Sequence, residues 1–215
     1  MTVEGDLAEQ FAVEDTGPVI DLRVDVVELA PQLLGCWLRQ DEVIVKITEV
    51  EAYAGLADPA SHAFIGPRPR TKDLFAKAGK LYCYLSHGLH ICGNITCGVK
   101  PDGSAILLRA GQVVSGLTQA QSRRGSVPEH QLGRGPGNLG RTMGWTLEHS
   151  GGCLGAGGLE LTEPTKPLAP GAIASGQRVG VSVAHQRPWR FWLAGEPSVS
   201  AYRRSPRAVG GDQAW

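Results

Sequence analysis

The chain has 215 residues, of which 42% are hydrophobic and 20% are charged, and its formal net charge is zero. This length suits a single domain with one hydrophobic core. No apolar run approaches the roughly 20 residues of a membrane span, and the first residues lack the pattern of a secretion signal. An odd number of cysteines, five, argues against a disulfide framework. We therefore expect a cytoplasmic or nucleoid protein with reduced thiols and no membrane partner.

The charge is distributed unevenly along the chain. Residues 1–30 carry eight acidic residues and one basic residue, so the remainder, 31–215, is mildly basic. A basic body permits a phosphate-binding face, although a solvated surface of mixed charge explains the same balance equally well. We expect residues 1–20 to be a disordered acidic segment, residues 21–205 to form the domain, and residues 206–215 to be a flexible tail.

The first half of the chain predicts one helix followed by strands. Asp25 is a suitable N-cap for a helix that reaches about Leu34, although Pro31 disfavours an unbroken helix. Apolar and β-branched runs predict strands at 36–40 and 42–53, joined as a hairpin. After these come a proline-containing loop at 55–72, a helical turn at 73–79, and strands at 81–85 and 89–96 that flank a tight hairpin tip.

The second half predicts a similar mixture of strands and helices. The apolar run at 104–110 predicts a buried strand, and 115–125 predicts a helix that ends at a glycine. The glycine-rich segment 133–144 contains a proline that suits the first turn of a helix. The last two predicted strands are 178–184 and 189–194.

The strand predicted at 42–53 carries the first candidate chemistry. The two-residue period of a strand places Ile47, Glu49, Glu51 and Tyr53 on one face. Paired carboxylates suit glycosidic bond hydrolysis, in which one carboxylate activates water. The alternative is an exposed strand face whose acids pair with lysines or arginines.

The hairpin predicted around residue 87 carries the second candidate feature. Tyr82 and Tyr84 share one strand face, and aromatic rings beside a carboxylate can sandwich a planar base. The same tyrosines would also suit ordinary core packing. His87 at the tip is suited to enter a base step as a wedge, or is simply a turn residue.

Zinc-type ligands in the same hairpin raise a metal alternative. The spacing of these residues matches neither a CxxC pair nor an HxxxH pair on a helix, so we expect no metal. The chain also lacks the phosphate-binding GxxxxGK[ST] loop and the GxSxG nucleophile elbow of hydrolases. The zinc-type residues are Cys83, His87, His90, Cys92 and Cys97.

Five segments, in this order, resemble the alkyladenine (3-methyladenine) DNA glycosylase family. The segments are ITEVEAYAGLADPASHAF, GKLYCYLSHGLHICGNIT, AILLRA, GPGNLGRTMG and RVGVSVAHQRPWRFW, and the resemblance runs from about residue 25 to about residue 202. It implies a mixed α/β (α+β) fold: a single domain with a curved, mainly antiparallel sheet, surrounding helices and a protruding β-hairpin. It also implies that the protein needs no metal or organic cofactor.

The resemblance assigns a role to each matching residue. Glu51 matches the general base that activates water, and Arg109 matches an arginine that helps to hold this base. Asn94 matches an asparagine on the pocket floor that discriminates against a guanine amino group. His87 matches the side chain inserted into the DNA, where the family often has tyrosine. The walls that contact the flipped base match Tyr53, His62 and Tyr84.

The activity implied by the resemblance is base excision repair. A monofunctional glycosylase would flip an alkylated or deaminated purine out of double-stranded DNA and hydrolyse its N-glycosidic bond, leaving an abasic site. We expect such a protein to act as a monomer. The alternative is a non-catalytic nucleic-acid-binding module of the same fold, since a fold does not determine a function. Glu51 separates the two hypotheses, because a pure binding module would not need it.

Overall fold

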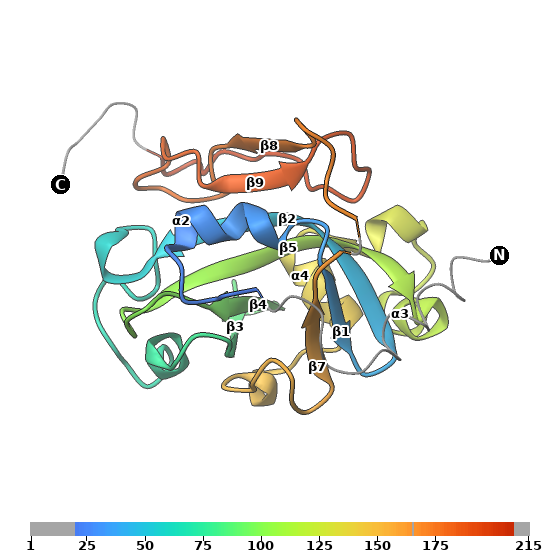
Figure 1. Ribbon diagram of the computed structural model, residues 1–215, viewed down its shortest axis with the longest axis horizontal. Helices are drawn as coiled ribbons and strands as arrows, with labels where there is room; N and C mark the ends of the chain where they lie inside the picture. The colour runs from blue at the N-terminus through green and yellow to red at the C-terminus, as the bar shows by residue number, and fades with distance from the viewer. Residues whose placement is uncertain (1–19, 165, 209–215) are drawn as a thin grey trace.

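The computed structural model describes residues 20–164 and 166–208, and within them one nine-stranded sheet forms the centre of the protein (Figure 1). The strands are β1 (Trp37–Gln40), β2 (Val43–Ala54), β3 (Leu81–Ser86), β4 (His90–Thr96), β5 (Ser104–Ser115), β6 (Gly133–Arg134), β7 (Leu159–Thr162), β8 (Ile173–Gly176) and β9 (Arg190–Leu193). Their main order is β3-β4-β5-β2-β1-β7; β6 pairs with β5, and β9 pairs with both β2 and β8.

Short helices accompany this sheet, and the strands β1 to β9 pair with one another in antiparallel fashion. The mixed α/β class predicted from the sequence is therefore confirmed. Most of the predicted acidic segment, residues 1–19, and the 209–215 part of the predicted tail lie outside the described residues. The helices are α2 (Val26–Leu29), α3 (Leu117–Arg124) and α4 (Pro136–Met143), with 3₁₀ helices η1 (Ala30–Leu33), η2 (Gly55–Ala57), η3 (Lys72–Phe75), η4 (Glu129–Gln131) and η5 (Leu147–His149).

The first predicted helix is divided in two. Asp25 is its N-cap as predicted, since its side chain accepts the N–H of Val27 at 2.8 Å. The α-helical turn ends at Leu29, and a 3₁₀ turn that contains Pro31 follows it. Proline has no N–H for an α-helical bond and its ring clashes with the preceding turn, which explains the change.

Strand β2 contains a bulge that changes which face its residues occupy. Ile47 pairs with Gly111 and Glu49 pairs with Ala110, so Thr48 is an extra residue on β2. The prediction that Ile47 shares a face with the two acids is therefore wrong, because Ile47 lies in the hydrophobic core. A second register shift follows at the next residue. Glu49 pairs with Ala110 whereas Val50 pairs with Leu108, so Arg109 is the extra residue on β5.

The two ends of β2 pair with different strands. Along one edge β2 pairs with β5 over most of its length, whereas along the other edge its first residues pair with β1 and Glu49, Val50 and Glu51 pair with β9. Figure 1 shows the β8–β9 hairpin as a layer beside α2 and β2. Glu49 and Glu51 of β2 are therefore close to side chains of β5 and to side chains of the C-terminal part of the chain.

The strand predicted at 178–184 is wrong, because these residues form turns and extended loop. Gly180 and Ala184 have φ angles of 73° and 48°, which interrupt a strand. The N–H of Val179 bonds to the side chain of Glu51 rather than to a neighbouring strand. The short strands β6, β7 and β8 were not predicted.

Helix α4 packs directly against the β3–β4 hairpin, and Gly140 permits this close approach. A Cβ atom at Gly140 would collide with the carbonyl oxygen of Ile91 in β4. We expect Gly140→Ala to lower the free energy of unfolding by about 1–3 kcal/mol, because backbone would have to move to make room. Chemical denaturation measures this loss, and Arg141→Ala, at an exposed position of the same helix, should change it by less than about 0.5 kcal/mol.

Candidate active site

A pocket of about 1110 Å³ opens beside the β3–β4 hairpin. Its walls come from this hairpin, the ends of β2 and β5, the loop after β2, the start of α4 and the loop at 179–183. The structure thereby brings together six of the seven residues predicted from the sequence. These pocket residues are Tyr53, His62, Tyr84, His87, Asn94 and Arg109.

Aromatic rings form one wall of the pocket. The His62 ring meets Tyr84 edge to face, with ring centroids 4.6 Å apart, and Tyr82 stacks on Tyr84 at 5.8 Å. Loss of hydration and the nearby charge of Arg70 lower the pKa of His62, which favours the neutral ring. Burial raises the pKa of Tyr82 to about 12 and that of Tyr84 further, so both phenols stay protonated. The wall is therefore uncharged and suited to stack on a flat ligand.

Asn94 occupies a buried position on β4 and is fixed by the neighbouring strand. Its Nδ2 atom donates to the backbone carbonyl of Tyr82 at 3.1 Å. This bond orients the amide in the pocket wall, where an amide can distinguish donors from acceptors on a ligand.

Glu51 lies directly behind the pocket wall and has no exposed surface. Its Oε1 atom accepts the backbone N–H of Val179 at 2.7 Å and lies 3.3 Å from Nη1 of Arg109. Its Oε2 atom accepts the hydroxyl of Tyr53 at 2.8 Å. All three of these neighbours line the pocket, so the carboxylate is one side chain away from it.

Glu49, two residues earlier on β2, anchors the arginines beneath the site. Its Oε1 atom accepts Nε of Arg109 at 2.8 Å and Nε of Arg190 at 2.6 Å, and its Oε2 atom accepts the N–H of Ser200 at 2.7 Å. Burial alone would raise the pKa of Glu49, but the two arginine charges and the bonds from Ser200 outweigh it and lower this pKa. Glu49 is thus a buried carboxylate that holds Arg109 between two acids.

Comparison with known proteins identifies the family. The family model described as methylpurine-DNA glycosylase (MPG) matches residues 21–197. The chain belongs to the methylpurine-DNA glycosylase family. A relative from Nocardia farcinica is 48% identical over 202 residues, which cover 89% of this chain and 94% of the relative. A relative from Cutibacterium acnes is 44% identical over 193 residues, which cover 86% of this chain and 100% of the relative.

Both relatives bear the name "Putative 3-methyladenine DNA glycosylase". A third relative of this name, from Mycobacterium bovis, is 41% identical over 199 residues, covering 87% of this chain and 95% of its own length. The family resemblance stated from the sequence is therefore confirmed over nearly all of the described chain.

In this family member, His87 occupies the tip of the β3–β4 hairpin. It is exposed and adopts a left-handed backbone conformation with φ of 51°, and its Nδ1 atom lies 3.1 Å from the hydroxyl of Ser86. Leu89, also on the tip, is 77% exposed. The hairpin predicted to protrude therefore exposes two imidazoles, His87 and His90, and two apolar side chains, Leu85 and Leu89, and all of these except Leu89 line the pocket.

The hairpin cysteines are buried thiols. Burial raises the pKa of Cys83 to about 12 and also raises that of Cys92, so both are protonated thiols at neutral pH. Among residues 20–164 and 166–208, no three His, Cys, Asp or Glu side chains form a group that could hold a metal ion. In the same part of the chain, no helix is long and apolar enough to cross a membrane.

Several residues of the candidate site were missed by sequence reasoning. Arg190 and Ser200 contact Glu49, and the buried pair of Asp58 and Arg178 lies behind Tyr53. The available signal was weak: Asp58, Arg178 and Arg190 stand within two of the segments that carry the family resemblance, and Ser200 stands just beyond the last of them. Their partners are distant in sequence, so spacing alone could not join them.

Proposed function

We propose that this protein is a monofunctional DNA glycosylase of base excision repair, which takes an alkylated or deaminated purine from duplex DNA into the pocket and hydrolyses its N-glycosidic bond. The observation that carries this proposal is the carboxylate of Glu51, held against the back of an aromatic pocket by donors that line it. Membership of the family supports the same function, as do relatives named for 3-methyladenine DNA glycosylase activity.

The pocket suits a flat, electron-poor base. A purine alkylated on a ring nitrogen carries positive charge, which is attracted to the faces of tyrosine rings such as Tyr53 and Tyr84. Stacking of a base on an aromatic side chain is worth about 1–3 kcal/mol, which offsets part of the few kcal/mol needed to extrude it. The neutral state of His62 avoids repulsion of such a cation.

In the proposed reaction, Glu51 accepts a proton from a water molecule whose oxygen bonds to the sugar carbon C1′. The bond from C1′ to the base nitrogen breaks, and its electron pair leaves with the base. A cationic methylated base departs neutral and needs no acid, whereas a neutral base such as hypoxanthine needs a hydrogen bond or proton as it leaves. Arg109 stays between Glu49 and Glu51 and fixes the orientation of the catalytic carboxylate.

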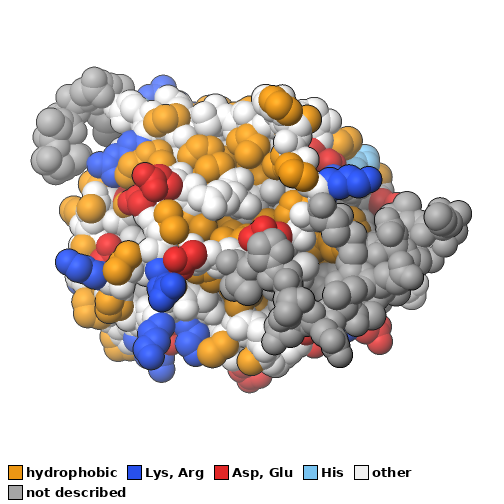
Figure 2. All heavy atoms as spheres, in the orientation of Figure 1, with side chains coloured by type: hydrophobic (Ala, Val, Ile, Leu, Met, Phe, Trp, Pro, Cys, Tyr) orange, Lys and Arg blue, Asp and Glu red, His pale blue; other side chains and the backbone are white. Residues whose placement is uncertain are grey.

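His87 is proposed to fill the gap that the extruded base leaves, since it stands exposed on the hairpin tip beside the pocket. Arg70, an exposed residue that also lines the pocket, is suited to contact a DNA phosphate. On the face shown in Figure 2, basic and acidic side chains are interspersed. We also propose that the protein acts as a monomer.

The test is to incubate the protein with a duplex carrying one hypoxanthine and, separately, with DNA alkylated by a methylating agent. Free base detected by chromatography and alkali-labile abasic sites are the expected products. Treatment with borohydride should trap no covalent protein–DNA complex, because no amine of the protein attacks the sugar. Binding to damaged DNA without base release from either substrate would instead support the non-catalytic module.

A further inference from the structure

An ion pair behind Tyr53 takes no part in the steps proposed above. Asp58 and Arg178 have no exposed side-chain surface. Both Nη atoms of Arg178 donate to the carboxylate of Asp58, with Nη2 and Oδ1 2.9 Å apart, and Nη1 also donates to the carbonyl of Ala52 at 3.0 Å. A bidentate arginine–carboxylate pair has a narrow range of geometries. It therefore ties the loop after β2 firmly to the loop after β8.

Arg178 supports the ring of Tyr53 from behind. The guanidinium carbon lies 4.6 Å from the centroid of the Tyr53 ring and 5.2 Å from that of Trp189. Tyr53 lines the pocket whereas Arg178 does not, so the guanidinium contacts the ring on the side away from the pocket. A cation held over a ring face favours one plane for that ring. The plane that Tyr53 offers to a base thus depends on where Asp58 holds Arg178.

The same pair also determines where the Glu51 carboxylate lies. Val179 follows Arg178 directly, and its N–H donates to Glu51 at 2.7 Å. The backbone at these two residues cannot shift without moving both this donor and the guanidinium. Burial alone would lower the pKa of Arg178, but the hydrogen bond and the charge of Asp58 outweigh it and raise this pKa, so the guanidinium stays charged.

Asp58 reaches a third site residue through its own loop. Its Oδ1 atom accepts the N–H of Ala60 at 3.2 Å, and its carbonyl accepts the N–H of Ser61 at 2.8 Å. Ser61 in turn accepts the N–H of Ala63 at 3.1 Å, which closes the turn that carries His62. One buried pair therefore lies under the aromatic wall, the stacking ring and the donor to the catalytic carboxylate.

We propose that Asp58 and Arg178 are positioning residues, which align Tyr53 and the Glu51 carboxylate for base excision. This inference rests on the proposed function. It requires the planar fork of arginine, because a lysine ammonium cannot bond both carboxylate oxygens in one plane and cover a ring face at the same time.

The test uses Asp58→Asn, which keeps the shape of the side chain, and Arg178→Lys, which keeps the charge. In both variants we expect the single-turnover rate of hypoxanthine excision from duplex DNA to fall about 10- to 100-fold, since small misplacements of reacting groups cost this much. The Kd for the same duplex should change by less than about threefold, as the remaining pocket and hairpin are intact.

A second measurement needs no substrate. Hydrogen exchange of the Val179 amide, followed by NMR in the free protein, should become at least about tenfold faster in Asp58→Asn, because its bond to Glu51 is loosened. Exchange at Leu108, in the middle of β5, should stay unchanged. This readout still tests the positioning role if the wild-type protein releases no base, an outcome that would count against the proposed function alone.

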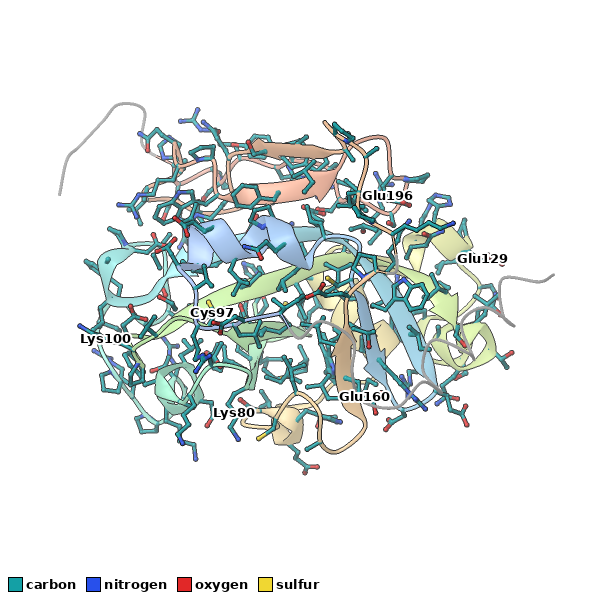
Figure 3. The ribbon with its side chains drawn as sticks, viewed as in Figure 1. Lys80, Cys97, Lys100, Glu129, Glu160 and Glu196 are labelled. Atoms are coloured by element: carbon teal, nitrogen blue, oxygen red, sulfur yellow. The ribbon has the colours of Figure 1, made fainter. Side chains whose placement is uncertain are left out.

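Glu196→Gln is the matched control. Glu196 accepts Nζ of Lys46 at 3.0 Å and so ties the segment after β9 to β2, away from the pocket (Figure 3). The excision rate of the Glu196→Gln variant should stay within about twofold of the wild-type rate. Wild-type excision rates and Val179 exchange in both pair variants would overturn the proposal. Equal losses of excision rate and of affinity for the duplex in both variants would overturn it as well, because they would show that the pair maintains the pocket as a whole rather than the alignment of Tyr53 and Glu51.

Discussion

Glu51→Gln should reduce the single-turnover rate of base excision by about 10²- to 10⁴-fold, the range expected when a general base is removed. The amide keeps the size of the side chain and still accepts a hydrogen bond from Val179 or Tyr53. It cannot accept a proton from water at neutral pH, so the chemical step is lost while the pocket stays formed. A gel assay with a duplex carrying one hypoxanthine measures the rate.

Binding separates a chemical role of Glu51 from a structural one. The Kd of Glu51→Gln for the same duplex should stay within about threefold of wild type, because the aromatic wall and the hairpin tip are unaltered. Glu129→Gln, at an exposed position on η4 (Figure 3), is the control for the substitution itself. Wild-type excision by Glu51→Gln would remove this residue from the mechanism and leave the pocket without its proposed base.

The strands and the hairpin around the pocket could be predicted because their signals are local. Alternating side chains around the turn at His87 predict the β3–β4 hairpin, and the apolar run after residue 104 predicts β5. The bulge at Thr48 could not be predicted, because nothing in its neighbours distinguishes a bulged strand from a regular one. The prediction of a strand at 178–184 was wrong for a related reason. The apolar residues of this segment alternate as in a strand, but hydrogen bonds to Glu51 and Asp58, which are distant in sequence, determine the path of its backbone.

The pocket residues were found through the family resemblance, whereas their supports were not. Glu49 illustrates the difference, because the sequence placed it beside Glu51 but assigned it no role. Its partner Arg109 is 60 residues away in sequence, and Arg190 and Ser200 are 141 and 151 residues away. Spacing reports only on neighbours within one element, so contacts between β2, β5 and the C-terminal segment appear first in the folded chain.

Glu49→Gln should destabilise the protein by about 3–5 kcal/mol, the loss typical when one partner of a buried ion pair is removed. The carboxylate has no exposed surface and accepts bonds from Arg109 and Arg190. Its neutral replacement would leave two buried guanidinium groups with less compensating charge. Urea denaturation followed by circular dichroism measures the difference in the free energy of unfolding.

The stability lost in Glu49→Gln should depend on pH, and the pKa of Glu49 gives the direction of this dependence. The pKa of Glu49 is lower in the folded protein than the ordinary value of 4.5, so its charge stabilises the fold fully above that value. The stabilisation is lost as the pH falls through the lower pKa of the folded state, where the carboxyl group becomes protonated. The stability gap between wild type and Glu49→Gln should therefore be widest near neutral pH and should narrow as the pH falls below 4.5.

Glu160→Gln is the control, because Glu160 faces solvent on β7 and pairs with Arg39 at 3.7 Å (Figure 3). An exposed pair contributes only about 0–1 kcal/mol, so the same substitution there should change stability little at any pH. A loss at Glu49 no larger than the loss at Glu160 would mean that water reaches the two arginines and compensates their charge. In that case Arg109 would not be held by Glu49, and the orientation of Glu51 would have to depend on Tyr53 and Val179 alone.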